Sequence, residues 1–533
     1  MALRAVRVLA LAIAAAALLL LVAIALGIPS ALGVPLTRFR EPTWALWAAL
    51  ALFVTAHDRP GEAWRRALGR AASILASRAF FGRMAASALA LYLLVSVRAH
   101  LSFHTFSHDF SMFDESLWWS HHGRFLYAPV LGRSYLTEHF SPILALLVPL
   151  HALVSSPWLL VVANAALLGA AVFPLRTLLD ALGLPAAARN AACLVYLTSP
   201  ITASALDYGF HVESFVPLLV FVLYAAHLRG PAWAYAILLV AALAIKEDVG
   251  LYLAGFGAFL FVAEKRRARG ALTAAAGLTW VLLVVLVVSP RLAGATGEYR
   301  FLSRWAAWGS GVGGVLGGMA ARPVAVLLAL TAPTYLLFFW RLVFTPFFTR
   351  WGWLLFVIPW VLGATSGSRP QATLGLYYGL PLLSFAGLAA AHGVAAMSKP
   401  ASSPKPRSAM GGRLAALAPA LAAIAVALNV AHFTVQPVPP VRDAVLTEIR
   451  RIPPGATVQA MPTLYPNLRY EQPKAVLMPG ESLTADYVLL RTDTTAWPFS
   501  SAQVNALTAR AIASGAYRAR FDRGGFRVLM RRS

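Results

Sequence analysis

Apolar runs long enough to form membrane-spanning helices recur along most of the chain, separated by short polar stretches. A helix needs roughly 20 apolar residues to cross the bilayer core. The pattern therefore predicts an all-α polytopic membrane protein with about 13 transmembrane helices. The run 142–154 is shorter, about 20 Å of helix against a core of about 30 Å, and predicts a partial or interfacial helix. The predicted spans lie near residues 8–27, 44–56, 84–98, 158–180, 187–206, 213–228, 233–247, 248–263, 271–289, 322–341, 351–365, 374–396 and 413–433.

The last hundred residues have a different pattern, in which short apolar stretches alternate with polar ones. Helical and strand periodicities follow one another there, and this predicts a small α/β domain over residues 434–533. The expected helices are Arg442–Arg451 and Ala502–Gly515, and the expected strands are Ala456–Ala460, Asp486–Leu490 and Phe526–Met530.

The distribution of basic residues predicts which side of the membrane each loop faces. The chain has 45 Lys and Arg against 21 Asp and Glu, a net charge of +24. Cytoplasmic loops are rich in Lys and Arg, so we place the Arg-rich loop before residue 84, the run 264–269 and the linker 398–413 in the cytoplasm. Because the cytoplasmic loops account for the positive charge, we expect no nucleic-acid partner. This distribution places the C-terminal domain on the extracytoplasmic side of the membrane.

Composition excludes a soluble enzyme, because only 12% of the residues are charged, against about 25% in ordinary soluble domains. The single cysteine, Cys193, cannot form an intramolecular disulfide. We therefore expect four parts. They are N-terminal transmembrane helices with a cytoplasmic basic loop (1–98), an extracytoplasmic acidic and aromatic loop with interfacial helices (99–157), a transmembrane helical core (158–433) and the C-terminal domain (434–533).

Acidic residues are scarce, and the first cluster of them lies in the outer loop after the third predicted span. Asp109 and Asp114 stand among Phe and Trp residues, and Glu138 and His139 follow. A carboxylate here is a candidate general base towards an acceptor hydroxyl, or Asp109 and His139 together are candidate ligands of a divalent cation. The alternative is a solvated acidic loop, which the interleaved aromatic residues disfavour.

Two further polar clusters interrupt apolar runs. Asp207, His211 and Glu213 fall within seven residues, and Lys246, Glu247 and Asp248 are adjacent. Charges at membrane depth are costly unless they are paired or functional. Lys246 is a candidate phosphate ligand, and the acids and His211 are candidate supporting groups. An interfacial turn with satisfied polar groups, or a structural ion pair, remains the alternative for these two clusters.

Two pairs of residues later in the chain are candidate contacts of a substrate. Arg300 and Arg304 form a basic pair suited to a phosphate or pyrophosphate, or else to anionic lipid headgroups. Tyr377 and Tyr378 begin a predicted helix, where they either stack on substrate or belong to an aromatic belt at the membrane surface.

Several of these motifs resemble those of a family of bacterial multi-spanning membrane proteins of unknown function. DFSMFDESLW (109–118) resembles a DLGIFDQALW-like motif, EHFSP (138–142) a DHFSP-like motif, and DYGFHVE (207–213) a DFHPE-like motif. KEDV (246–249) is unchanged, and YYGLPLL, IPPGATV and ADYVLL follow in the same order. The chain departs from the pattern at Ser111-Met112, Glu115 and Glu138, and DYGFHVE has an extra residue and no proline.

This family looks like a distant relative of the GT-C glycosyltransferases, polytopic enzymes that use polyprenyl-phosphate-linked sugars. The resemblance implies that Asp109 is the catalytic base or a metal-binding acid and that Asp114 is its partner. The implied partners are membrane lipids, a polyprenyl-phosphate-linked sugar donor and a glycan, lipid or protein acceptor. A cofactor is not established, and Mg²⁺ or Mn²⁺ is left open. The alternative function is a transporter or lipid flippase.

Overall fold

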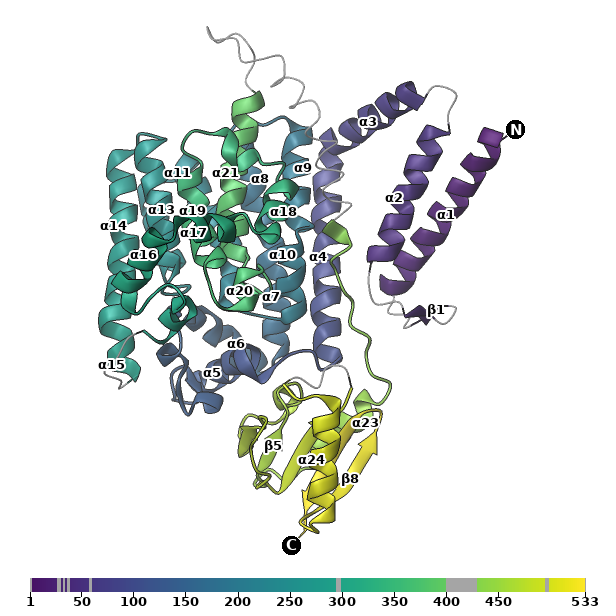
Figure 1. Ribbon diagram of the computed structural model, residues 1–533, viewed down its shortest axis with the longest axis vertical. Coiled ribbons are helices and arrows are strands. Elements are labelled where there is room, and N and C mark those ends of the chain that lie inside the picture. The colour runs from purple at the N-terminus through teal and green to yellow at the C-terminus, as the bar shows by residue number, and fades with distance from the viewer. Residues whose placement is uncertain are drawn as a thin grey trace.

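The computed structural model describes residues 2–25, 30–31, 34–35, 39–56, 60–293, 299–398, 429–493 and 498–532. Most of the predicted span 413–433, and the linker that precedes it, lie outside the described residues. The rest is a bundle of helices with a small α/β unit at one end (Figure 1). We call residues 434–493 and 498–532 the tail. The limits of the other three predicted parts remain predictions.

The N-terminal helices lie beside the main bundle. Helices α1 (Ala2–Ala25) and α2 (Arg40–Thr55) pack on each other, and two-residue strands β1 (Ser30–Ala31) and β2 (Val34–Pro35) pair between them. Helix α3 (Pro60–Ala76) then leads to the long α4 (Arg78–Leu101). In Figure 1, α4 runs along the bundle, and its C-terminal end meets the tail.

The segment that follows α4 contains short helices that lie across the tail end of the bundle. They are π-turn η1 (Ser107–Ser111), α5 (Met112–His121), 3₁₀ segments η2 (Pro129–Leu131), η3 (Tyr135–Thr137) and η4 (Pro142–Leu147), and α6 (Val148–Val154). Strands β3 (Tyr127–Ala128) and β4 (Arg133–Ser134) form a small hairpin. The stretch 142–154 forms two short helical pieces, η4 and α6, and its interfacial position stays a prediction.

The bundle itself is built from apolar helices joined mostly by short loops. They are α7 (Trp158–Ala170), α8 (Val172–Ala181), α9 (Ala186–Leu197), α10 (Pro200–Tyr208), α11 (Phe215–Arg229), α12 (Ala232–Leu243), α13 (Val249–Val262), α14 (Arg267–Leu283), α15 (Ser289–Ala293), α16 (Gly311–Ala321), α17 (Pro323–Leu330), α18 (Pro333–Arg341), α19 (Trp353–Ala364), α20 (Arg369–Ala372) and α21 (Leu380–Ser398). Further short turns are η5 (Val212–Ser214), η6 (Val284–Val288), η7 (Arg300–Trp305) and η8 (Thr345–Phe348).

Among the described residues, 6 helices are long and apolar enough to cross a membrane by themselves, so the total of 13 spans remains a prediction. The expected continuous span 322–341 is wrong. It is divided between α17 and α18, and α17 bends by 89° from α16. Pro323 and Pro333 each begin a helix there. Proline lacks the N–H that would continue the preceding helix and favours the first helical turn.

Glycines allow one pair of helices to pack unusually closely. A Cβ atom at Gly257 of α13 would lie 2.4 Å from the backbone nitrogen of Ala274, and one at Gly277 of α14 would lie 2.3 Å from the carbonyl oxygen of Gly250. No side chain fits at such distances, so α13 and α14 meet backbone to backbone. The contact at Gly250 lies at the start of α13, directly after the turn that carries Lys246, Glu247 and Asp248.

The tail contains a five-stranded sheet in the order β6-β5-β7-β9-β8. Strand β5 (Val458–Ala460) runs parallel to β6 (Lys474–Val476) and β7 (Tyr487–Arg491). Strand β9 (Phe526–Arg531) runs antiparallel to β7 and to β8 (Tyr517–Arg523). The expected helices are present as α23 (Arg442–Arg450) and α24 (Ser501–Ala513). The sequence did not predict β6 and β8, because β6 has three residues and β8 is largely charged.

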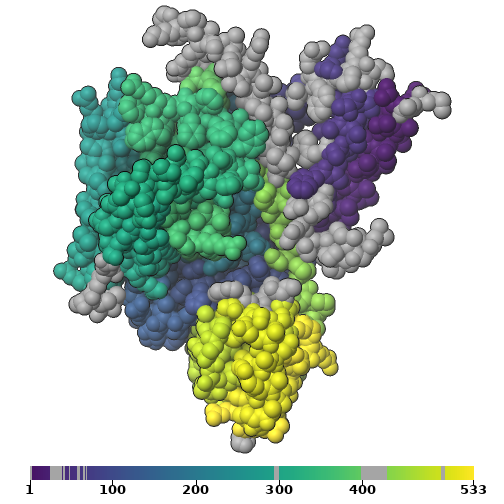
Figure 2. Space-filling model, in the orientation of Figure 1, coloured from purple at the N-terminus to yellow at the C-terminus, as the bar shows by residue number. Residues whose placement is uncertain are grey.

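Figures 1 and 2 show where the tail lies. It is a separate body at one end of the bundle, below α5 and α6. Helix α15 also lies at this end, so the start of α14 and the basic run before it lie at the opposite end (Figure 1). Ion pairs join the three predicted polar motifs 109–115, 207–213 and 246–248 to one another.

Candidate functional site

Asp109 lies in the irregular turn between α4 and α5. Its backbone has φ 64° and ψ −76°, inside the π-turn η1. These angles are close to those of the rare γ-turn with positive φ, which is strained for a residue with a side chain. Strained backbone of this kind persists only where surrounding contacts hold it, and it is concentrated at functional sites.

The Asp109 carboxylate contacts two side chains from a distant part of the chain. The Tyr208 hydroxyl donates a hydrogen bond of 2.5 Å to Oδ2, and His211 Nε2 lies 3.6 Å from Oδ1. The Asp109 side chain is 20% exposed, whereas His211 is buried. The carboxylate is thus fixed in position and still partly accessible.

A row of buried groups with alternating charge lies behind Asp109. His211 Nδ1 donates to Glu213, and Lys246 Nζ donates to the other oxygen of Glu213 at 2.8 Å. Burial alone would lower the pKa of His211, but the carboxylates of Glu213 and Asp109 raise it above its ordinary value. Burial would likewise raise the pKa of Asp109, but His211 and the Tyr208 hydrogen bond lower it. Both shifts favour an ionised Asp109 carboxylate beside a protonated His211 imidazole.

Aromatic rings connect this row to a cation. The His211 and Tyr377 rings are stacked, with centroids 3.4 Å apart. The Tyr377 hydroxyl donates to the Tyr378 hydroxyl at 3.0 Å, and Arg304 donates to Tyr378 and to Gln371, both at 3.3 Å. Among the described residues, the hydrogen-bond partners of the Arg304 side chain are uncharged. Arg304 thus retains the capacity to pair with an anion.

A second network is centred on Glu247. Its carboxylate accepts hydrogen bonds from His139 Nδ1 at 2.6 Å, from the backbone N–H of Phe140 at 3.0 Å and from Tyr299. The ring of Phe301 stacks on His139 with a centroid distance of 4.1 Å. These contacts attach the turn η7, which carries the two predicted arginines, to the 138–140 segment.

The remaining predicted residues occupy the edge of the site. Arg300 is paired with Glu138 at 2.5 Å, and its side chain is 60% exposed. Asp248 accepts from Tyr252 at 3.0 Å, and its other oxygen is buried without a hydrogen-bond partner among the described residues. Asp207 accepts from Gln436 at 2.9 Å, where the chain enters the tail.

The structure does not support the predicted pairing of Asp114 with Asp109. His151 Nε2 donates to Asp114 at 3.1 Å, and His121 contacts the other nitrogen of His151 at 3.2 Å. Asp114 follows Asp109 by a turn and part of a helix, so its side chain faces α6 instead of the site.

The structure places Lys246 in an ion pair, and its role as a phosphate ligand stays a prediction. Its ammonium group is buried against Glu213, which corresponds to the alternative of a structural ion pair. This hydrogen bond uses one of the three N–H donors of an ammonium group whose side chain is 3% exposed. Of the predicted cations, Arg304 and Arg300 are the two that approach the open part of the site.

Asp109 and His139, the predicted ligands of a divalent cation, contact different partners. Asp109 is held by Tyr208 and His211, whereas His139 is held by Glu247. Among the described residues, no group of three or more His, Cys, Asp or Glu could hold a metal ion. The residues present do not fit the cation, and we derive no step through it.

Three contributing residues were not predicted from the sequence. Tyr208 holds Asp109, Tyr299 holds Glu247 and Gln371 holds Arg304. Tyr208 lies inside the DYGFHVE motif, and Tyr299 precedes Arg300, so their positions next to charged residues were the available signal. Gln371 lies in the short helix α20, outside all of the motifs that the sequence singled out.

Comparison with known proteins gives a family and a general likeness of fold. The model of the family described as "Predicted membrane protein (DUF2079)" matches residues 99–528. None of the curated proteins matches the chain. Two crystal structures of ArnT from Cupriavidus metallidurans are similar at 13% sequence identity, one bound to undecaprenyl phosphate and one in the apo state. Their TM-scores are 0.47 and 0.46, and the match covers 85% of this chain and 98% and 97% of theirs.

The buried pair of Lys246 and Glu213 predicts a large effect on stability. In Lys246→Met the Glu213 carboxylate loses its cation and stays buried, which costs about 3–5 kcal/mol. We expect a clearly lower midpoint in thermal unfolding of the purified protein in detergent. Arg300→Met is the matched control, because its exposed pair with Glu138 contributes about 0–1 kcal/mol. Equal midpoints for the two variants would contradict this account.

Proposed function

The chain belongs to the DUF2079 family of predicted membrane proteins, and we propose that it is a GT-C-type glycosyltransferase. In this proposal it transfers a sugar from a polyprenyl-phosphate-linked donor to an acceptor on the extracytoplasmic face. The acceptor is a glycan, lipid or protein hydroxyl. Because the polar site lies at the end of an apolar bundle, a lipid-linked donor can keep its chain in the bilayer and place its headgroup in the site.

One observation carries this proposal: a partly exposed anionic carboxylate stands in a strained turn, connected through Tyr377 and Tyr378 to Arg304. Asp109 takes the proton of the acceptor hydroxyl, and the acceptor oxygen forms a bond to the anomeric carbon of the sugar. The bond between that carbon and the phosphate oxygen breaks, and the lipid phosphate leaves with the electron pair. Arg304 stabilises its charge, with Arg300 at the edge of the site.

The remaining charged groups position Asp109. Glu213 holds His211 through Nδ1, so Nε2 faces Asp109. Lys246 compensates the charge of Glu213. His211 lowers the pKa of Asp109 and so favours its ionised form. A carboxylate that is ionised and oriented before substrate binds loses little free energy to reorganisation during the reaction.

Replacing Asp109 tests this assignment directly. Asp109→Asn keeps the shape of the side chain but cannot accept a proton, so transfer should fall by about 10²–10⁴-fold. The assay uses the purified protein with a panel of radiolabelled polyprenyl-phosphate-linked hexoses and pentoses. Asp180→Asn is the control, because Asp180 is an exposed residue of α8 outside the site.

Transfer by Asp109→Asn at the rate of the unaltered protein would refute the catalytic role. A protein that transfers no sugar from any donor, but exchanges the donor lipid between the leaflets of reconstituted vesicles, would instead be a transporter or flippase.

The pH dependence of transfer provides a second test. His211 lowers the pKa of Asp109, so the unaltered protein should keep full activity down to the ordinary carboxyl range, about pH 4. His211→Gln removes the imidazole that lowers the pKa of Asp109, so this pKa should rise. Activity should then fall at a correspondingly higher pH as the solution is acidified. His432→Gln is the control, because His432 contacts Arg341 of α18. A fall in activity at the same pH in His211→Gln and in the unaltered protein would contradict this coupling.

The sidedness of the site is part of the same proposal and can be tested separately. The basic loop 264–269 lies at the opposite end of the bundle from the tail, so the positive-inside rule puts the tail outside. Single cysteines replace Arg523 in the tail or Arg267 at the start of α14, with Cys193 changed to alanine. A membrane-impermeant maleimide applied to intact cells should label position 523, and position 267 only after permeabilisation. Equal labelling of both would overturn the proposed topology.

A further inference from the structure

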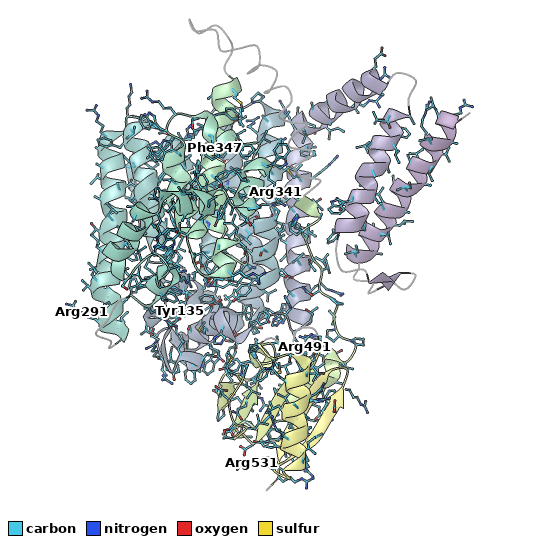
Figure 3. The ribbon with its side chains drawn as sticks, viewed as in Figure 1. Tyr135, Arg291, Arg341, Phe347, Arg491 and Arg531 are labelled. Carbon is cyan, nitrogen blue, oxygen red and sulfur yellow. The ribbon has the colours of Figure 1, made fainter. Side chains whose placement is uncertain are left out.

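The tail contacts the segment that carries Asp109 at three separate points. This segment, residues 102–115, runs from the end of α4 through η1 into α5. Figure 3 shows Arg491 of the tail at the junction with the bundle, and Figure 2 shows the tail directly beneath the 99–157 region. The contacts come from different strands and turns of the tail, so they fix the segment in more than one direction.

The first contact is at Phe103, directly after α4. Phe103 has φ 58°, a left-handed conformation that usually requires glycine, and its side chain is fully buried in the hydrophobic core of the tail. Its ring lies 5.2 Å from that of Phe526. The buried Arg491 guanidinium donates to the carbonyl oxygens of Ser102 and Phe103, at 3.1 and 3.0 Å. A cation is favourable at this position because the C-terminal end of α4 carries a partial negative charge.

The other two contacts lie on either side of Asp109 along the remaining segment. The backbone N–H of Ser107 donates to the carbonyl oxygen of Pro462 at 2.9 Å. Glu115 of α5 is paired with Lys474, the first residue of β6, at 2.5 Å. The side chains of this pair are only 3% and 2% exposed, and Tyr465 donates to the second Glu115 oxygen at 3.4 Å. The tail therefore holds the chain before and after the strained residue.

We propose that Arg491 and Lys474 are positioning residues of the site, which hold the 102–115 segment in the conformation that presents the Asp109 carboxylate. Two residues with strained positive φ, Phe103 and Asp109, lie in this segment. Strain persists only when surrounding contacts over-determine it, and at Phe103, Ser107 and Glu115 those contacts come from the tail. The tail is thus a structural part of the site without contributing a residue that touches substrate. The consequence for catalysis rests on the function proposed above, whereas the positioning itself does not.

Hydrogen–deuterium exchange of the full-length protein in nanodiscs tests the positioning. In Arg491→Met and in Lys474→Met, amide exchange in peptides covering 102–115 should be at least about tenfold faster, because these contacts no longer oppose local opening. Exchange in 526–530 within the tail sheet should stay within about twofold of the unaltered protein, which shows that the tail remains folded. Arg520→Met is the matched control, since it removes a tail ion pair with Glu448 that does not touch the segment.

A double variant separates positioning from general damage. Lys474→Met leaves Glu115 buried without a cation, whereas Lys474→Met with Glu115→Met replaces the pair by apolar side chains of similar size, an exchange that buried pairs often tolerate. Slow exchange in 112–115 should return in the double variant. Unchanged exchange throughout 102–115 in both single variants would overturn the inference, and so would fast exchange in Arg520→Met.

Transfer assays on the same variants connect the positioning to function. Arg491→Met should lower kcat about tenfold and leave the donor KM within about twofold, because the contacts of Arg304 are on other elements. Faster exchange with unaltered kcat would refute the role of Asp109 in the proposed function and leave the positioning intact. Unaltered exchange with lowered kcat would refute the positioning instead.

Discussion

The site depends on the row of alternating charges that begins at Lys246 and ends at Asp109. Lys246 contacts Glu213, Glu213 contacts His211, and His211 faces Asp109. In a bundle with so few charged residues, an unpaired member of this row would be buried at high cost. Each member comes from a loop between helices, and the charges can be satisfied only when these loops meet. The pairing therefore brings the 102–111 turn, the start of α11 and the turn before α13 to one place.

This constraint also explains why the site is rigid on one side and open on the other. Behind Asp109 the partners are buried, and His211 is held between a carboxylate and the Tyr377 ring. In front of it, the Asp109 side chain remains partly exposed, and Arg304 has only uncharged hydrogen-bond partners among the described residues. Contacts through His211, Tyr377 and Tyr378 thus connect a partly exposed carboxylate to a cation with free capacity.

The sequence located most of the polar groups of the site but not their pairing. Asp109, Glu213 and Glu247 were identified because acidic residues are scarce in this chain and these three stand near apolar runs. Charged side chains at such positions are costly unless they are paired or functional. The same logic could not tell that Lys246 faces Glu213, 33 residues earlier, or that Asp114 faces His151, 37 residues later. These choices depend on how helices pack. In the fold, long apolar helices and the tail helices were predictable from periodicity, whereas the bend between α16 and α17 and the strands β6 and β8 were not.

The strained turn at Asp109 is in contact with both the bundle and the tail. A carboxylate in a relaxed helix would have many neighbours of the same helix to define its direction, but Asp109 lies where helical geometry is interrupted. Its direction is set by Tyr208 and His211 from the bundle, while its backbone is held at Ser107 by the tail. Side-chain and backbone constraints therefore come from two different bodies. An arrangement of this kind makes the orientation of the carboxylate sensitive to the docking of the tail, even though the tail lies outside the row of charges.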